Sequence, residues 1–305
     1  MIDLPSNIKF DSVGNPGVLR VSYVESMSTP RDEVAALRDP LDLWGVAWIL
    51  NHGSSERVID VRPPRGLSRA QWRTLVLRMA VLQDCMTGFE FRLDGTSRHV
   101  QEAAEIRGDI RSGLLFSYDR ANLHRGAAGT KPAPEAVVEA WVGEHAKKFL
   151  HGAFPHRMVR QFPAGVFKTS LAERNRATSK LWIDLVGVDK EGRLSAIEMK
   201  VGDDLTMERF AKGIDGAIFC HEFHKYMQRS WFPDVTSDRI ALYLVADHFA
   251  PALVGVDGDS GHPLTEALQA SDWLDVILVQ IDSAGLPHGL GEHIVFPSPA
   301  PTPVE

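Results

Sequence analysis

Cysteine is scarce in this sequence. Cys85 and Cys220 are the two cysteines in 305 residues, and they lie far apart and outside any pair motif. No disulfide framework is indicated, so the reducing cytoplasm is the expected location. The longest hydrophobic run, residues 43–50 (LWGVAWIL), is far shorter than the roughly 20 residues that cross a bilayer. The opening residues, MIDLPSNIKF, have no basic segment followed by an apolar one, so we expect neither a secretory signal nor a membrane partner.

Two further features are missing. The phosphate-binding pattern G-x-x-x-x-G-K-[ST] does not occur, so an ATP-driven motor is not indicated. An excess of positive charge is lacking too, because the net charge is −7, and this argues weakly against non-specific binding to nucleic acid. The distribution of charge is uneven, however. Residues 145–180 hold eight Lys or Arg against one acid, Glu173, and such a cluster suits a phosphate backbone.

The length suits two domains, and composition indicates where they meet. Residues 1–127 mix strand-like and helix-like patterns, which predicts an N-terminal α+β domain of unknown role. Residues 128–134 end a stretch rich in Gly, Ala and Pro, which predicts a linker. Residues 135–296 predict a second α/β (α+β) domain, a mixed sheet flanked by helices. The Pro-rich residues 297–305 are predicted to be a disordered tail.

In the first domain, alternating apolar and polar residues predict strands at 17–26 and 89–95. Apolar residues at helical spacing follow Ser68, a residue type that caps helices, and predict a helix there. Another helical stretch is expected in two pieces that break before Pro40. In the second domain, Pro134 opens a helix, and three strands, a long helix, a strand, a helix and a strand follow. This order predicts a mixed sheet with helices on its faces.

One predicted hairpin, residues 181–200 (LWIDLVGVDKEGRLSAIEMK), carries charge inside apolar strands. Its turn fits a three-residue loop in which Gly192 takes the left-handed conformation. In that register Asp184 lies opposite Glu198, and Lys200 lies on the same face as Glu198, because side chains in a strand alternate faces. Opposed Cβ atoms are about 5 Å apart, so the two carboxylates would repel each other.

A divalent cation between Asp184 and Glu198 would remove this repulsion, because Mg²⁺ binds carboxylate oxygens and keeps several waters. Such a metal lowers the pKa of its water and polarises a phosphoryl oxygen, and Lys200 beside it would stabilise the developing charge. These residues therefore suit phosphodiester hydrolysis. The alternative interpretation is a surface hairpin whose three charged residues form an exposed ladder of ion pairs.

The Asp184 and Glu198-Met-Lys200 pattern resembles the core motif of the PD-(D/E)xK phosphodiesterase superfamily, which includes type II restriction enzymes and archaeal Holliday-junction resolvases. The usual core of that superfamily is a helix, three strands, a helix and a strand, and the order predicted from residue 135 matches it. The resemblance covers residues 134–282. It implies a restriction-endonuclease-like domain and an Mg²⁺- or Mn²⁺-dependent endonuclease or exonuclease.

Carried over to this sequence, the resemblance makes Asp184 and Glu198 the metal carboxylates and Lys200 the catalytic lysine. Ile197 would offer a metal-facing backbone carbonyl. Many members add an acid from the first helix, for which Glu144 is the candidate, with Glu139 and Glu173 as alternatives.

The expected partner is nucleic acid, DNA rather than RNA, in repair, restriction or phage defence, and a homodimer is compatible with this. The residues expected to contact phosphates are Arg157, Arg160, Lys168, Arg174 and Arg176. Two alternatives stay open: a catalytically inactive binding or protein-interaction module on the same fold, and an RNA-cleaving toxin.

Overall fold

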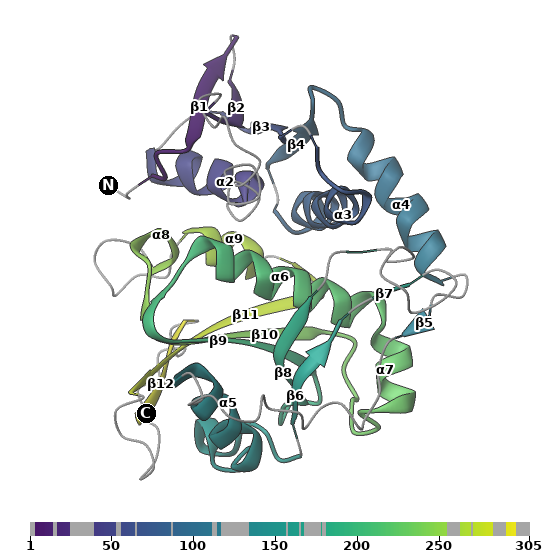
Figure 1. Cartoon of the computed structure of the whole chain (residues 1–305), viewed down its shortest axis with the longest axis vertical. Helices are drawn as coiled ribbons and strands as arrows, with labels where there is room; N and C mark the ends of the chain where they lie inside the picture. Colours follow the sequence, from purple (N-terminus) through teal and green to yellow (C-terminus); the bar gives the residue numbers. More distant parts are fainter. Residues whose placement is uncertain are drawn as a thin grey trace, which may run out of the picture. The chain divides into compact units, whose positions relative to one another are not determined.

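The chain is described from a computed structural model. The residues that the structure describes are 4–14, 17–24, 40–52, 56–64, 66–86, 88–111, 115–116, 134–156, 158–164, 166–167, 178, 181–254, 263–269, 271–282 and 291–296. They form two mixed sheets flanked by helices, as the sequence predicts (Figure 1). Among the described residues, every helix is too short or too polar to cross a membrane.

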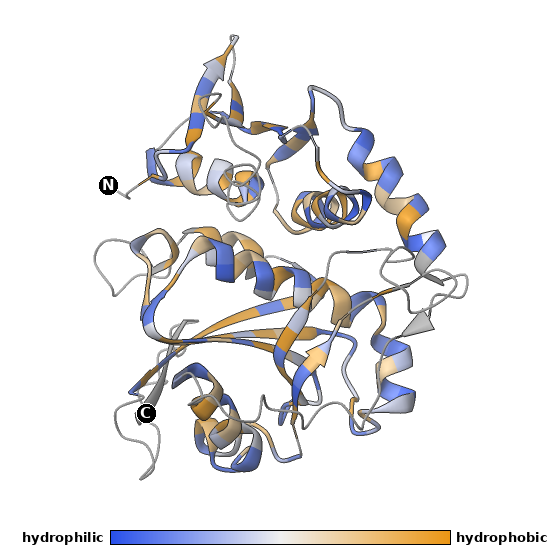
Figure 2. Ribbon diagram, in the orientation of Figure 1, coloured by the Kyte–Doolittle hydropathy of each residue, from blue (hydrophilic) through white to orange (hydrophobic). Residues whose placement is uncertain are grey.

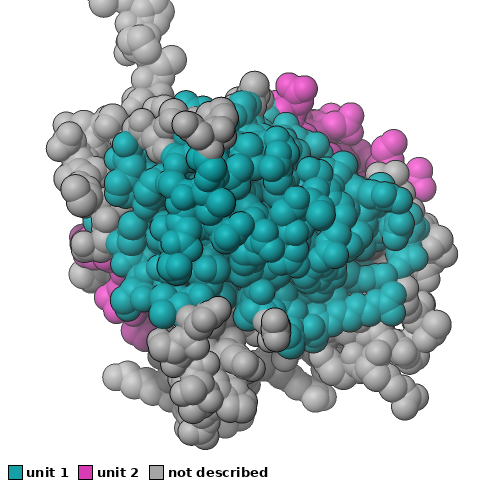
Figure 3. All heavy atoms as spheres, turned by 90° about the horizontal axis from the view of Figure 1, so that it is seen from above, with its two compact units in different colours: residues 1–115, 166–179, 251–271 teal, residues 116–165, 180–250, 272–305 magenta. Residues whose placement is uncertain are grey.

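The chain divides into two compact units (Figure 3). The first contains Met1–Leu115, Val166–Ser179 and Pro251–Ser271, and the second contains the remaining three segments, Phe116–Gly165, Lys180–Ala250 and Asp272–Glu305. The sequence predicts one boundary at 128–134, whereas segments of the two units alternate along the chain. A pattern of local composition shows a linker, but it cannot show that a later segment returns to an earlier core. Residues 117–133 and the tail at 297–305 lie outside the described residues.

The first unit is built on a four-stranded sheet of order β1-β2-β3-β4, in which β1 and β2 are antiparallel and the other pairs are parallel. Its main elements are β1 (Ile8–Val13), β2 (Val18–Tyr23), α2 (Leu41–His52), β3 (Val58–Arg62), α3 (Arg69–Cys85), β4 (Glu90–Leu93) and α4 (Arg98–Arg111). The short helices α8 (Pro251–Val254) and α9 (Pro263–Gln269) also belong to this unit. The two-residue strands β5 (Leu115–Phe116) and β7 (Val166–Phe167) pair with each other, and the boundary between the units falls within β5.

Two local features of the first unit explain where helix α3 begins and how closely helix α2 packs on the sheet. The predicted cap of α3 is confirmed, because Ser68 accepts a hydrogen bond from the Gln71 N–H and the Gln71 side chain accepts one from the Ser68 N–H. Helix α2 packs closely on the sheet at Gly45, where an added Cβ would lie 2.7 Å from Ile59 Cγ2. The strands expected at 17–26 and 89–95 are β2 and β4. Helix α2 begins after Pro40, and the piece expected before Pro40 lies outside the described residues.

The second unit is built on a six-stranded sheet of order β12-β11-β10-β9-β8-β6. Its elements are α5 (Pro134–Glu144), η2 (Phe149–Gly152), β6 (Val159–Pro163), β8 (Trp182–Val188), β9 (Leu194–Leu205), α6 (Met207–Glu222), α7 (His224–Ser230), β10 (Ile240–Phe249), β11 (Leu274–Asp282) and β12 (Gly291–Phe296). They follow the predicted order up to β10, but the helix predicted before the last strand is α9, which belongs to the first unit. The long helix expected after the three strands is broken at Phe223 into α6 and α7. The sequence pattern did not indicate β12.

Helices α5 and α6 cover opposite faces of this sheet (Figure 1). Ile197, Met199 and Val201 of β9 join the core that contains Val138 and Val142 of α5. Helix α6 instead packs on the other face at Gly213, where an added Cβ would lie 2.9 Å from Leu244 Cδ2. The central strands are largely hydrophobic in Figure 2 because both of their faces are buried.

The predicted register of the β8–β9 hairpin is confirmed. The strands pair from Leu185 with Ile197 to Val188 with Leu194, as the three-residue loop requires. Gly192 has φ +73°, in the left-handed region, and its N–H donates to the Asp189 carbonyl at 3.0 Å. The side chain of Asp189 further fixes the turn by accepting hydrogen bonds from the backbone N–H groups of Glu191 and Arg193.

Candidate active site

Asp184 lies just beyond the Leu185–Ile197 pair, where the backbone pairing of β8 with β9 ends. Its carboxylate there accepts a hydrogen bond from a backbone N–H of β9. The printed pairing of β8 with β9 runs to Leu185 and Ile197, and beyond it the Met199 N–H donates to Asp184 Oδ2 at 2.9 Å. The Asp184 side chain is buried. The strand pattern therefore places a carboxylate between two strands and leaves its second oxygen, Oδ1, for another partner.

The partner of that oxygen is an amine from α6. Lys212 Nζ donates to Asp184 Oδ1 at 2.9 Å and to Glu198 Oε1 at 2.8 Å. The two accepting oxygens are therefore at most about 5.7 Å apart, the sum of these distances. The expected proximity of Asp184 and Glu198 is confirmed, but the group between them is an ammonium from the chain itself.

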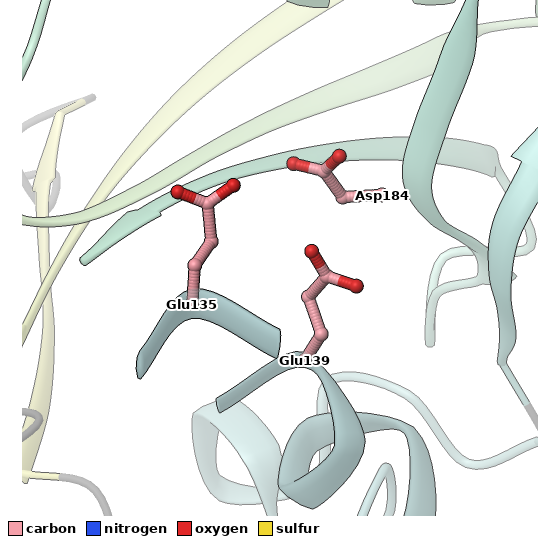
Figure 4. Close-up of side chains that lie close together, drawn as sticks. All are labelled: Glu135, Glu139 and Asp184. Atoms are coloured by element: carbon pink, nitrogen blue, oxygen red, sulfur yellow. The ribbon is translucent and has the colours of Figure 1, made fainter. Parts of the chain in front are cut away.

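Helix α5 brings two more carboxylates to the other side of Asp184. Glu135 and Glu139 are four residues apart, so they project from the same face of the helix. Figure 4 shows both side chains pointing from the helix toward Asp184. One oxygen from each of these three residues, which we call the acidic trio, lies within 4.8 Å of the others.

Glu139 is buried, and its surroundings oppose its charge. Burial raises the pKa of Glu139 to about 7; the nearby Asp184 carboxylate adds to this shift, and the hydrogen bond from Gln161 opposes it. The Gln161 Nε2 donates to Glu139 Oε2 at 2.7 Å, and Arg160 approaches the same oxygen at 4.0 Å. An additional cation is the change that would favour the ionised form of this carboxyl group.

Glu198 is even more strongly affected. Its burial, and then the neighbouring Asp184 carboxylate, raise the pKa of Glu198 to about 8, although Lys212 and Arg209 act in the opposite direction. Arg209 Nη1 donates to Glu198 Oε1 at 3.0 Å. Burial disfavours the charged form of Lys212, but the Glu198 and Asp184 carboxylates outweigh it and raise the pKa of the amine. The two carboxylates therefore favour the charged form of Lys212 at this position.

Lys200, the lysine of the sequence motif, lies at the edge of this arrangement. Its Nζ is 3.7 Å from Glu135 Oε2 and 3.1 Å from Asp203 Oδ2. Arg209 also approaches Glu135, at 3.5 Å from Oε1. Glu135 is thus bordered by two cations, and Lys200 contacts the acidic trio through Glu135.

The other predicted site residues are placed as follows. Glu144 is exposed at the C-terminal end of α5, whereas the acids that this helix brings to Asp184 are Glu135 and Glu139. Ile197 pairs with Leu185 on one side and Tyr243 on the other, and a metal-facing role for its carbonyl stays a prediction. The Arg160 Nη2 donates to the Ala136 carbonyl at 3.2 Å. The other residues expected to contact phosphates lie outside the described residues: Arg157, Lys168, Arg174 and Arg176. Glu173, an alternative helix acid, lies outside them too.

Sequence reasoning missed Glu135, Arg209 and Lys212. Two signals point to them. Glu135 and Glu139 have i, i+4 spacing in the helix that opens the domain, and Arg209 and Lys212 have i, i+3 spacing in the helix that follows the motif strand. Either pair reads as a solvated helix face until the sheet between the two helices is known.

The donor set of the acidic trio is made of carboxylate oxygens, which hard cations such as Mg²⁺, Mn²⁺ and Ca²⁺ prefer. Glu139 and Asp184 are buried and Glu135 is half-buried, and carboxylates within 4.8 Å of each other raise one another's pKa unless a cation lies close to them. The residues therefore fit a divalent ion, and they do not by themselves select magnesium.

Comparisons of this chain with family models, with curated proteins and with solved structures found no match.

Proposed function

We propose that this protein is a metal-dependent phosphodiesterase that cleaves nucleic acid, DNA in preference to RNA. The observation that carries the proposal is the convergence of carboxylates on Asp184. Glu198 from the adjacent strand shares the Lys212 ammonium with Asp184, and one oxygen each of Glu135 and Glu139 from α5 lies within 4.8 Å of an Asp184 oxygen. The resemblance to the PD-(D/E)xK motif and the matching order of elements support it. The proposal places the chemistry in the second unit, which contains all of these residues.

In this proposal the acidic trio holds the metal ion. A divalent ion bound there supplies a water of lowered pKa and a Lewis acid for a phosphoryl oxygen. Asp184 is fixed for this task by the Met199 N–H, and Glu139 by the Gln161 amide. Glu198 holds Lys212 and Arg209, and it thereby orients two cations near the position of the phosphate. Lys200, at 3.7 Å from Glu135, is available to a phosphate oxygen or to the attacking water.

The test is a cleavage assay with Mg²⁺ or Mn²⁺ on single-stranded and duplex DNA and on RNA. Glu139→Gln is expected to lower kcat by about 10²-fold or more, because it removes a proposed ligand and keeps the side-chain volume. Asp184→Asn should have at least the same effect. Glu144→Gln is the matched control, because it makes the same change at an exposed position of the same helix, and it should retain full activity.

Wild-type protein that cleaves none of these substrates with either metal would contradict the enzyme proposal, and retained binding to nucleic acid would then favour the inactive binding module. Cleavage of RNA alone would favour the toxin alternative. Full activity of Glu139→Gln, equal to that of Glu144→Gln, would show that the Glu139 carboxylate is not part of the site.

A further inference from the structure

We infer that Lys212 takes the place of a second metal ion, so that the site binds a single divalent cation on the α5 side of Asp184. This inference rests on the proposed function and assigns the role of a fixed cation to a residue outside the sequence motif. It concerns Asp184 Oδ1 and Glu198 Oε1, the carboxylate oxygens that the sequence motif predicts as metal ligands.

The contacts of Lys212 are those of a bound cation. Its Nζ bridges Asp184 Oδ1 and Glu198 Oε1 at 2.9 and 2.8 Å, and both carboxylates are buried. The other oxygen of Asp184 accepts from Met199, which fixes the carboxylate plane. An ion that used the same two oxygens would have to displace an amine that two carboxylates hold.

The backbone of α6 sets this position. Gly213 follows Lys212, and an added Cβ there would lie 2.9 Å from Leu244 Cδ2 and 3.1 Å from Leu242 Cδ1. The glycine therefore allows the helix to approach the sheet closely. The same hypothetical Cβ would lie 3.5 Å from the Cβ of Glu198, so the helix passes directly over the motif strand and Lys212 meets both carboxylates.

The charge count favours one divalent ion over two. The connected groups include four carboxylates, Glu135, Glu139, Asp184 and Glu198, and three cations, Lys200, Arg209 and Lys212. Asp203 beside Lys200 and Arg160 beside Glu139 add one charge of each sign. The fully ionised cluster is thus one positive charge short. A single divalent ion brings it to +1, which matches the single negative charge of a phosphodiester, whereas two would bring it to +3.

Lys200, the lysine of the sequence motif, does not lie between Asp184 and Glu198 as Lys212 does. Its amine contacts Glu135 and the exposed Asp203, and it leaves the two oxygens between Asp184 and Glu198 to Lys212. The two lysines are therefore predicted to respond differently when each is replaced by methionine, which keeps the aliphatic stem and removes the charge.

The experiment counts Mn²⁺ ions bound per chain at pH 8, by titration calorimetry and by electron paramagnetic resonance of the free ion. Wild type is expected to bind one ion. Lys212→Met is expected to bind two, because the oxygens of Asp184 and Glu198 become available. Lys200→Met and Lys212→Arg are expected to bind one, since each retains a cation between those oxygens. The double variant Glu198→Gln with Lys212→Met should return to one.

Wild type that binds two ions would overturn the inference and leave the proposed function intact, and so would Lys212→Met that binds one. Wild type that binds none would contradict the proposed function itself. If Lys212→Met folds only with metal, it is purified in Mn²⁺, and its metal content after gel filtration is compared with that of wild type. Two ions per chain support the inference, and one overturns it.

Discussion

The Met199 N–H donates a buried hydrogen bond of 2.9 Å to Asp184 Oδ2 at the point where β8 and β9 cease to pair. The carboxylate therefore completes the backbone ladder as well as joining the acidic trio. Replacement by alanine would leave a buried N–H without its acceptor, which costs about 1–3 kcal/mol. Asparagine keeps an acceptor oxygen, so Asp184→Asn separates the chemical role of this residue from its structural one.

Stability without divalent metal should fall as pH rises. The folded pKa of Glu198 is about 8, above its ordinary value of 4.5, so the folded protein binds this proton more tightly than the unfolded chain does. The resulting stabilisation is complete below pH 4.5 and is lost as pH rises toward 8. In urea titrations from pH 5 to 9 with a chelator, Glu198→Gln should lose less stability than wild type, by on the order of a few kcal/mol across the range. Parallel pH profiles would contradict this prediction.

Metal binding should release protons. The pKa of Glu139 is raised to about 7, so at pH 6 most of this carboxyl group must lose a proton before it binds a cation. Mn²⁺ affinity is therefore expected to rise by up to about tenfold per pH unit below pH 7, since each pKa unit corresponds to a factor of ten. Calorimetry at pH 6 in two buffers with different ionisation enthalpies measures the released protons. Glu139→Gln should lose this release, and Glu144→Gln should keep it.

Lys200 should contribute to catalysis without contributing much to stability. It is partly exposed, and its contacts with Glu135 and Asp203 are ion pairs near the surface, which are worth about 0–1 kcal/mol. Under the proposed function, Lys200→Ala is expected to lower kcat by about 10²-fold with little change in KM. Lys190→Ala, an exposed lysine in the turn of the same hairpin, is the control and should match wild type. A loss confined to KM would assign Lys200 to substrate binding only.

Gly192 should be essential to the hairpin turn. It has φ +73°, and an added Cβ would lie 1.9 Å from Thr236 Oγ1, so Gly192→Ala combines backbone strain with a steric clash. Gly202 has φ +84° with open space around the same position, so Gly202→Ala isolates the strain. Strain alone costs about 1–2 kcal/mol, and we expect the Gly192 variant to lose more than this. Equal losses in chemical denaturation would show that Thr236 moves aside without cost.

The hairpin and its register could be predicted because they depend on local rules. Alternation along a strand and a glycine in a three-residue turn fix which residues face each other, and both are visible in the sequence. The proximity of Asp184 to Glu198 follows directly from them. The order of elements from residue 135 could also be predicted, because it depends on where apolar periodicity changes from helix to strand.

The helix acid was harder to choose for a geometric reason. Glu144 is the helix acid predicted from the sequence to face the sheet, but the buried stripe of α5 is centred on Val138 and Val142. Glu139 lies beside that stripe, and Glu144 is five residues further, roughly 140° around a helix of 3.6 residues per turn. Placing the stripe on the wrong side of α5 therefore changes which carboxylate is expected to meet Asp184.

The sequence by itself determined the two strands of the hairpin, its turn and the pair of motif carboxylates, since each depends on residues close together in the chain. The tertiary structure alone decided that Lys212 lies between those carboxylates and that Glu135 and Glu139 lie beside Asp184. These contacts join residues of helices α5 and α6 to residues of β8 and β9, which belong to the sheet that lies between the two helices. They depend on how closely each helix packs on its face of the sheet, which is a property of the assembled core.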